Sequence, residues 1–216
     1  MKKILKPLVI ASSVLIALFI MAIGIFALII VPNKQAAVAA AYSARVQAHP
    51  LTTASILSDV NEQRMAHGIR PLSINGDIVK SSEAKCADMV AKNYYEHTGP
   101  DGKTVGGWVG ETTKNWKSAN ENLNKGNFVA SFEVVDSWMN SPDHKNTMLD
   151  AKFTDTGIAI CDYPDGQKVI VQQFVLYYTA EEIQAAQPKY SNVSNRTTIC
   201  STIGGSYGIP ITTYCH

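Results

Sequence analysis

The feature of the sequence that most constrains the fold is an uncharged, mainly apolar run from Leu8 to Val31. A helix needs about 20 apolar residues to cross a bilayer, and this run is long enough to cross with some tilt. Three lysines precede it, which by the positive-inside rule keeps the N-terminus in the cytoplasm. The pattern predicts a cytoplasmic basic tip over 1–7, a single-pass transmembrane anchor over 8–31, and export of the rest.

A cleaved signal peptide is the alternative interpretation of this run. The small residues between Ala36 and Ala41 offer a cleavage site. However, the apolar core of a signal peptide is about 7–15 residues long, and the run here is longer. The sequence therefore favours an uncleaved anchor in the cell membrane.

Composition divides the exported part into three segments. Residues 32–50 are alanine-rich and predict a stalk, residues 51–180 carry the periodic patterns of a folded domain, and residues 181–216 form an irregular C-terminal extension. The formal net charge of the chain is +1, so no basic surface favours nucleic acid as a partner.

All four cysteines follow the anchor, in a compartment where disulfides persist. Four cysteines allow three pairings, among which sequence alone cannot choose. Cys200 with Cys215 closes a short local loop, which would leave Cys86 with Cys161. The alternative is that Cys86 and Cys161 are free and serve as small buried apolar residues.

The domain reads as helices followed by a β-hairpin. Hydrophobic periodicity predicts helices over 55–67, from the N-cap Asn75 to Asn93, and from 127 or 128 to 140, where Pro142 closes the last of them. Alternation and β-branched residues predict antiparallel strands over 153–163 and 168–178, and a further strand is expected within 104–123. This order predicts an α+β fold.

Three polar residues follow the ends of helices or stand in the loop between them: His97, Glu121 and His144. Two imidazoles can bind zinc or another divalent cation. A carboxylate beside a histidine can orient its ring or act with it in acid–base catalysis. On spacing alone a purely structural role is the stronger interpretation, because each residue can also serve as an ordinary helix-end or loop residue.

The chain resembles the CAP superfamily, also called SCP/PR-1-like, and within it the bacterial extracytoplasmic branch. The resemblance covers about residues 51–178 and rests on these segments in this order: Val60–Arg64, Arg70–Leu72, Tyr95–Gly102, Asn120–Leu123, Trp138–Asn146, Phe153–Gly157 and Gln172–Phe174. It implies a CAP-type α-β-α sandwich with a cavity in which two histidines and acidic residues converge.

By this resemblance His97, Glu121 and His144 match three cavity positions. Some relatives carry a second acid on the third helix, where this chain has Ser141, which is not acidic. Asp136 lies on the same helix and is a weaker candidate for that role.

The sequence thus predicts an extracytoplasmic binding module, in which His97 and His144 take zinc or another divalent cation and Glu121 orients a ring. The resemblance leaves the ligand open, with lipid and peptide both candidates. Two alternatives remain: a metal-dependent hydrolase with Glu121 as general base, and a structural surface protein with a vestigial cavity. Whether the chain is an enzyme stays open.

Overall fold

The computed structural model describes the backbone of residues 5–186, 200–203 and 212–215, and the side chains of residues 15–21, 23 and 34–186. The chain divides into two compact units, Met1–Ala48 and His49–His216. Unit one is the helix α1 (Leu5–Ala48). None of the helices, over the residues whose placement is described, combines the length and apolar character that crossing a membrane requires. Most side chains of the apolar run over 8–31 lie outside the described residues, so the anchor stays a prediction.

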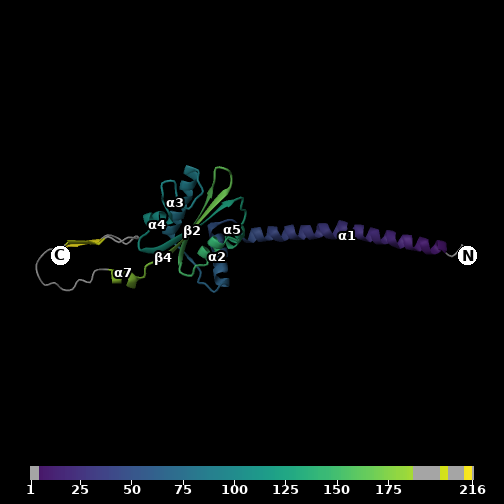
Figure 1. Ribbon diagram of the computed structural model, residues 1–216, viewed down its shortest axis with the longest axis horizontal. Coiled ribbons are helices and arrows are strands. Elements are labelled where there is room, and N and C mark those ends of the chain that lie inside the picture. The colour runs from purple at the N-terminus through teal and green to yellow at the C-terminus, as the bar shows by residue number, and fades with distance from the viewer. Residues whose placement is uncertain (1–4, 187–199, 204–211, 216) are drawn as a thin grey trace. The chain divides into compact units, whose positions relative to one another are not determined.

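The second unit contains the remaining elements. They are α2 (Thr53–Ala66), β1 (Ser73–Ile74), α3 (Gly76–Lys92), α4 (Val105–Thr112), β2 (Trp116–Gly126), α5 (Ser131–Met139), α6 (Pro142–Met148), β3 (Asp155–Asp162), β4 (Lys168–Tyr177), α7 (Ala180–Ala186), β5 (Cys200–Ile203) and β6 (Thr212–Cys215). Figure 1 shows these elements coloured in chain order. The mixed composition confirms the α+β class.

A four-stranded sheet in the order β1-β3-β4-β2 forms the middle layer. β4 is antiparallel to both β2 and β3, which confirms the hairpin, while β1 is parallel to β3. The strand expected within 104–123 is β2, which begins later and runs to Gly126. The sequence did not indicate α4, the short helix that precedes it.

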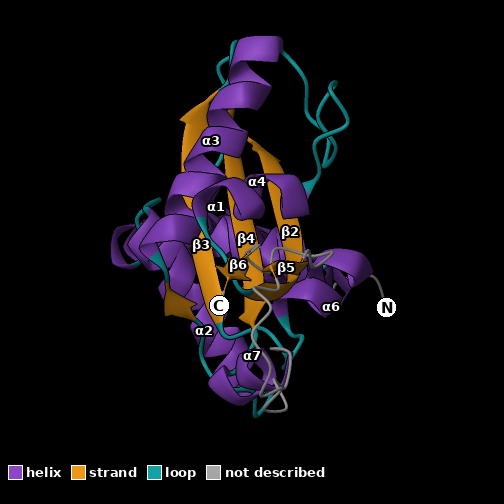
Figure 2. Ribbon diagram, turned by 90° about the vertical axis from the view of Figure 1, so that its left-hand side faces the viewer, coloured by secondary structure: helices purple, strands orange, loops and turns teal. Residues whose placement is uncertain are grey.

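Helices cover both faces of the sheet, as the α-β-α arrangement requires. On one face α2, α5 and α6 pack around Trp138, which is fully buried. On the other face α3 and α4 pack on β3, β4 and β2, and Figure 2 shows these two helices in front of the strands. Because both faces are covered, β4 is buried without alternation from Val169 to Val175, and this stretch is apolar except for Gln172 and Gln173.

Gly157 on β3 allows α3 to approach the sheet closely. A Cβ atom there would lie 2.2 Å from the carbonyl carbon of Ile78, well inside any van der Waals contact. One turn further along α3, the Ser82 hydroxyl donates to the Gly157 carbonyl at 3.0 Å. The glycine therefore fixes the depth at which α3 lies on the sheet.

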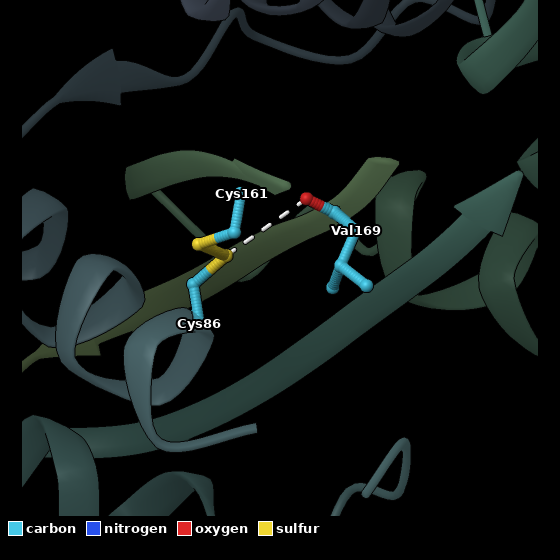
Figure 3. The surroundings of a disulfide bond; sticks show 3 residues. All are labelled: Cys86, Cys161 and Val169. Carbon is cyan, nitrogen blue, oxygen red and sulfur yellow. Dashed lines mark hydrogen bonds between the residues drawn. A yellow bond between two sulfur atoms is a disulfide. The ribbon is translucent and has the colours of Figure 1, made fainter. Parts of the chain in front are cut away.

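A disulfide between Cys86 and Cys161 ties α3 to β3, which confirms this pairing. Figure 3 shows the bond beside the carbonyl of Val169 on β4, 3.8 Å from the Cys86 sulfur. Cys200 and Cys215 are direct partners in the β5–β6 register, as a local bridge would need. Their side chains lie outside the described residues, so the second disulfide stays a prediction.

Candidate functional site

His97 and Glu121 meet at the edge strand of the sheet. His97 lies in the segment after α3, and Glu121 lies on β2. The His97 Nδ1 atom is 3.0 Å from the Glu121 Oε1 atom. A carboxylate accepts hydrogen bonds, so this contact places a hydrogen on Nδ1, and in the neutral ring Nε2 then carries the free lone pair.

Glu121 is held more firmly than the histidine it orients. Its side chain is 2% exposed, whereas that of His97 is 59% exposed. Its second oxygen, Oε2, accepts a hydrogen bond from the Gln173 side-chain amide at 3.2 Å. Both carboxylate oxygens are therefore engaged within the protein.

A buried lysine, Lys85 on α3, holds the segment that carries His97. Its ammonium donates to the carbonyls of Glu96 at 2.7 Å and His97 at 3.1 Å, and to the Tyr94 hydroxyl at 3.2 Å. Burial lowers the pKa of Lys85, and the carboxylate of Glu121 partly opposes this effect. Nothing in the sequence indicated this role, because a lone lysine on a helix ordinarily faces water.

Tyr94 connects the same segment back to α3. Its hydroxyl donates to Asp88 Oδ2 at 2.7 Å, and Lys92 forms an ion pair with Asp88 at 2.7 Å. Burial alone would raise the pKa of Asp88, but its hydrogen bonds with Lys92 and Tyr94 outweigh this effect and lower it.

His144 lies inside a helix, which corrects the prediction that it stands in a turn beyond a helix end. Pro142 does follow the end of α5, but it also begins α6 as its first residue, where its missing N–H costs no hydrogen bond. The Asn122 side chain on β2 donates to the His144 carbonyl at 2.9 Å. Burial, reinforced by His97 and opposed by Asp143, lowers the pKa of His144. The neutral imidazole, which is the form that binds metals, is thereby favoured.

These residues share one cavity of about 400 Å³. Its walls are His97, Thr98, Thr104, Val105, Asn120, Glu121, Asn122, Ser141, Asp143, His144 and Thr147. The structure thus brings together the three residues singled out from the sequence. Asp136 on α5 is not among the described residues that line it, whereas Asp143, which the sequence did not indicate, is.

Asn122 lines this cavity and supports His144 through its side chain. The residue is fully buried, its amide nitrogen is bonded to His144, and its Oδ1 atom has no hydrogen-bond partner among the described residues. A buried acceptor without a partner is costly, and because the Oδ1 atom is itself buried, a ligand in the cavity does not reach it.

The nitrogen donors that line the cavity are the imidazoles of His97 and His144. No group of three or more His, Cys, Asp and Glu side chains in the described part of the chain is arranged to hold a metal. What the cavity offers a divalent cation is these two imidazoles. Remaining coordination positions would fall to water or to a bound ligand.

Comparison with known proteins identifies the class of protein that this fold and cavity define. The model of the CAP family, described as the cysteine-rich secretory protein family, matches residues 57–178, more than half of the chain. The chain belongs to the CAP family, in agreement with the resemblance in its motifs.

Two proteins that are similar to this chain in sequence are bacterial. The chain is 34% identical over 115 residues to "Uncharacterized protein YkwD" of Bacillus subtilis, a match that covers 53% of this chain and 43% of that protein. It is 24% identical over 120 residues to "Uncharacterized membrane protein YlbC" of the same organism, covering 56% and 33%. The matched part thus spans less than half the length of each curated relative.

Solved structures share the fold. An outer surface protein from Borrelia burgdorferi aligns with a TM-score of 0.53 at 20% identity, covering 60% of this chain and 98% of that one. An extracellular protein containing an SCP domain from Bacillus anthracis aligns with a TM-score of 0.51 at 22% identity, covering 59% and 44%.

Proposed function

We propose that this chain is an extracytoplasmic binding module whose cavity takes a divalent cation, with zinc as the first candidate, between His97 and His144. One observation carries the proposal: the buried carboxylate of Glu121 lies 3.0 Å from His97 Nδ1, in the cavity that His144 also lines. A carboxylate behind a histidine is the usual support of a metal-binding imidazole. Here it fixes the ring and leaves Nε2 as the ligand atom.

A binding role is better supported than hydrolysis. A general base needs a carboxylate oxygen free to take a proton from water. Both oxygens of Glu121 are engaged, one by His97 and one by Gln173. Glu121 is 2% exposed and bonded to both neighbours, so it is better placed to support His97 than to take a proton from water, which favours binding over the hydrolase alternative.

Anchoring through residues 8–31 completes the proposal. The apolar run supports it, and the relatives include proteins described as outer surface, extracellular and membrane proteins. Cell-surface proteolysis with a C-terminal tag tests this part. Loss of the tag from intact cells supports it, whereas spontaneous release of the tagged chain into the medium contradicts it.

The cation site is tested by titrating the purified full chain with zinc in a calorimeter. His97→Ala and His144→Ala should each abolish or strongly weaken binding. Glu121→Gln keeps the shape of the side chain and should weaken binding about 10- to 100-fold, the usual effect of removing a ligand's supporting carboxylate. His67→Ala, in an exposed histidine at the end of α2, is the matched control. Equal zinc binding by all four variants would refute the site.

A further inference from the structure

Two consecutive residues of β2, Glu121 and Asn122, contact the two segments that carry the histidines of the cavity. Neighbouring side chains of a strand point to opposite faces of the sheet. On one face Glu121 Oε1 lies 3.0 Å from His97 Nδ1, in the segment after α3. On the other face the side-chain amide of Asn122 donates to the His144 carbonyl on α6 at 2.9 Å. One short stretch of the edge strand therefore touches both histidine segments.

The helix that carries His144 depends on other elements for its position. α6 has seven residues, and a helix of this length is not stable by itself in water. Its C-terminal end is held by Arg64, which is fully buried and donates to the Met148 carbonyl at 2.7 Å. The Met148 side chain lies in the core beneath. The turn that carries His144 is held from β2.

Two asparagines of β2 bond to α6, and they differ in burial. Asn120 is exposed and donates to the Thr147 hydroxyl at 3.1 Å, so water competes for this bond. Asn122 is fully buried, so water does not replace its bond to the His144 carbonyl. The Asn122 bond is therefore the more durable link between β2 and α6.

Asn122 makes this link at a cost to stability. Its Oδ1 atom is buried and has no hydrogen-bond partner within the described part of the chain. A leucine has a similar branched shape and would bring no buried acceptor. Proteins break such packing rules chiefly at functional sites, which favours a role for Asn122 in the cavity over a role in stability.

We propose that Asn122 is a positioning residue that places the His144 imidazole opposite His97, so that Glu121 and Asn122 together fix the separation of the two rings before a cation binds. Asn122 acts through the His144 carbonyl and does not itself touch the cation. The consequence for zinc affinity rests on the proposed function, whereas the placement of the His144 ring does not.

The first test uses NMR of the two histidine rings in the metal-free full chain. Asn122→Leu should shift the ring signals of His144 and leave those of His97 in place. Asn122→Ala, which adds no bulk, should give the same result. Asn124→Leu is the matched control, because Asn124 lies on the same face of β2 and donates to the Val134 carbonyl on α5 at 3.4 Å. It should leave both rings unchanged.

The second test measures zinc affinity and Tm for the same variants. Asn122→Leu should weaken zinc binding about 10-fold, the lower end of the range for groups that support a metal ligand. Its Tm should stay close to that of the wild type, because removal of the buried acceptor offsets the lost hydrogen bond. In a chain that already carries His144→Ala, Asn122→Leu should weaken binding no further, whereas Glu121→Gln still should.

The outcomes separate this proposal from the cation site itself. Unchanged His144 signals in metal-free Asn122→Leu would overturn the positioning role, whether or not the wild type binds zinc. A chain that binds no zinc but shows the His144 shift only in the Asn122 variants would refute the cation site and support the positioning role. Zinc affinity that falls in step with Tm across all variants, Asn124→Leu included, would also overturn the proposal, because it would reduce the effect to general stability.

Discussion

Replacing Lys85 by methionine tests how the fold positions the candidate site. The ammonium of Lys85 is fully buried and donates three hydrogen bonds of 2.7–3.2 Å to the segment that carries His97. Methionine keeps the apolar length of the chain but removes every donor. Hydrogen bonds from a charged group contribute about 1.5–3 kcal/mol each.

The segment from Tyr94 to His97 is largely exposed, so water recovers part of the lost hydrogen bonding. We therefore expect Lys85→Met to reduce the free energy of unfolding by about 3 kcal/mol in total. For a domain of this size that corresponds to a decrease in Tm of roughly 6–12 °C.

Calorimetric melting of the purified chain measures the effect, and NMR of the His97 ring reports whether its contact with Glu121 is lost. Lys80→Met is the matched control, because Lys80 lies on the same helix with its side chain 69% exposed. It should change Tm little and leave the His97 signals in place. An unchanged Tm for Lys85→Met, or unchanged His97 signals in a destabilised variant, would refute the assigned role.

Three further predictions concern the framework of the domain. Gly157→Ala should destabilise the protein by at least about 3 kcal/mol in chemical unfolding, because the new Cβ would meet the α3 backbone at 2.2 Å; wild-type stability would contradict the close approach. Reducing the disulfide between Cys86 and Cys161, 75 residues apart, should cost about 4 kcal/mol by chain entropy, and a melt unaffected by reductant would contradict it. The folded protein lowers the pKa of Asp88 below its ordinary value of 3.8. The ionised carboxylate therefore stabilises the fold at pH values above 3.8, and this contribution is lost as the pH falls below 3.8. Asp88→Asn should flatten this part of the pH–stability curve, and an unchanged curve would argue against the contribution.

The features that the sequence predicted best are those that short local patterns determine, such as helix caps and hairpins. Asn75 caps α3 by accepting a hydrogen bond from the Asp77 N–H at 3.0 Å, as its position before an amphipathic run indicated. The hairpin of β3 and β4 followed from alternation and from the β-branched residues of the two strands. Thr179 and Glu182, three residues apart as in a capping box, form reciprocal bonds at the start of α7.

The sequence did not predict features that arise from contacts between distant segments. Pro142 was interpreted as a stop, although the same residue is favoured at the first position of a helix, and this placed His144 wrongly in a turn. Lys85 and Asn122 carried no local signal, since their roles depend on carbonyls of other elements. The meeting of His97 with Glu121 was inferred from resemblance to a family, because no spacing rule joins residues so far apart.

The proposed cation site requires that His97 and His144 hold one divalent cation with Glu121 behind His97. Anomalous diffraction at the zinc absorption edge, from crystals of the zinc-loaded chain, locates the metal directly. We expect one strong peak bonded to His97 Nε2 and to the His144 ring, with the contact between His97 Nδ1 and Glu121 retained. A peak elsewhere, or none in this cavity at saturating zinc, would contradict the proposal.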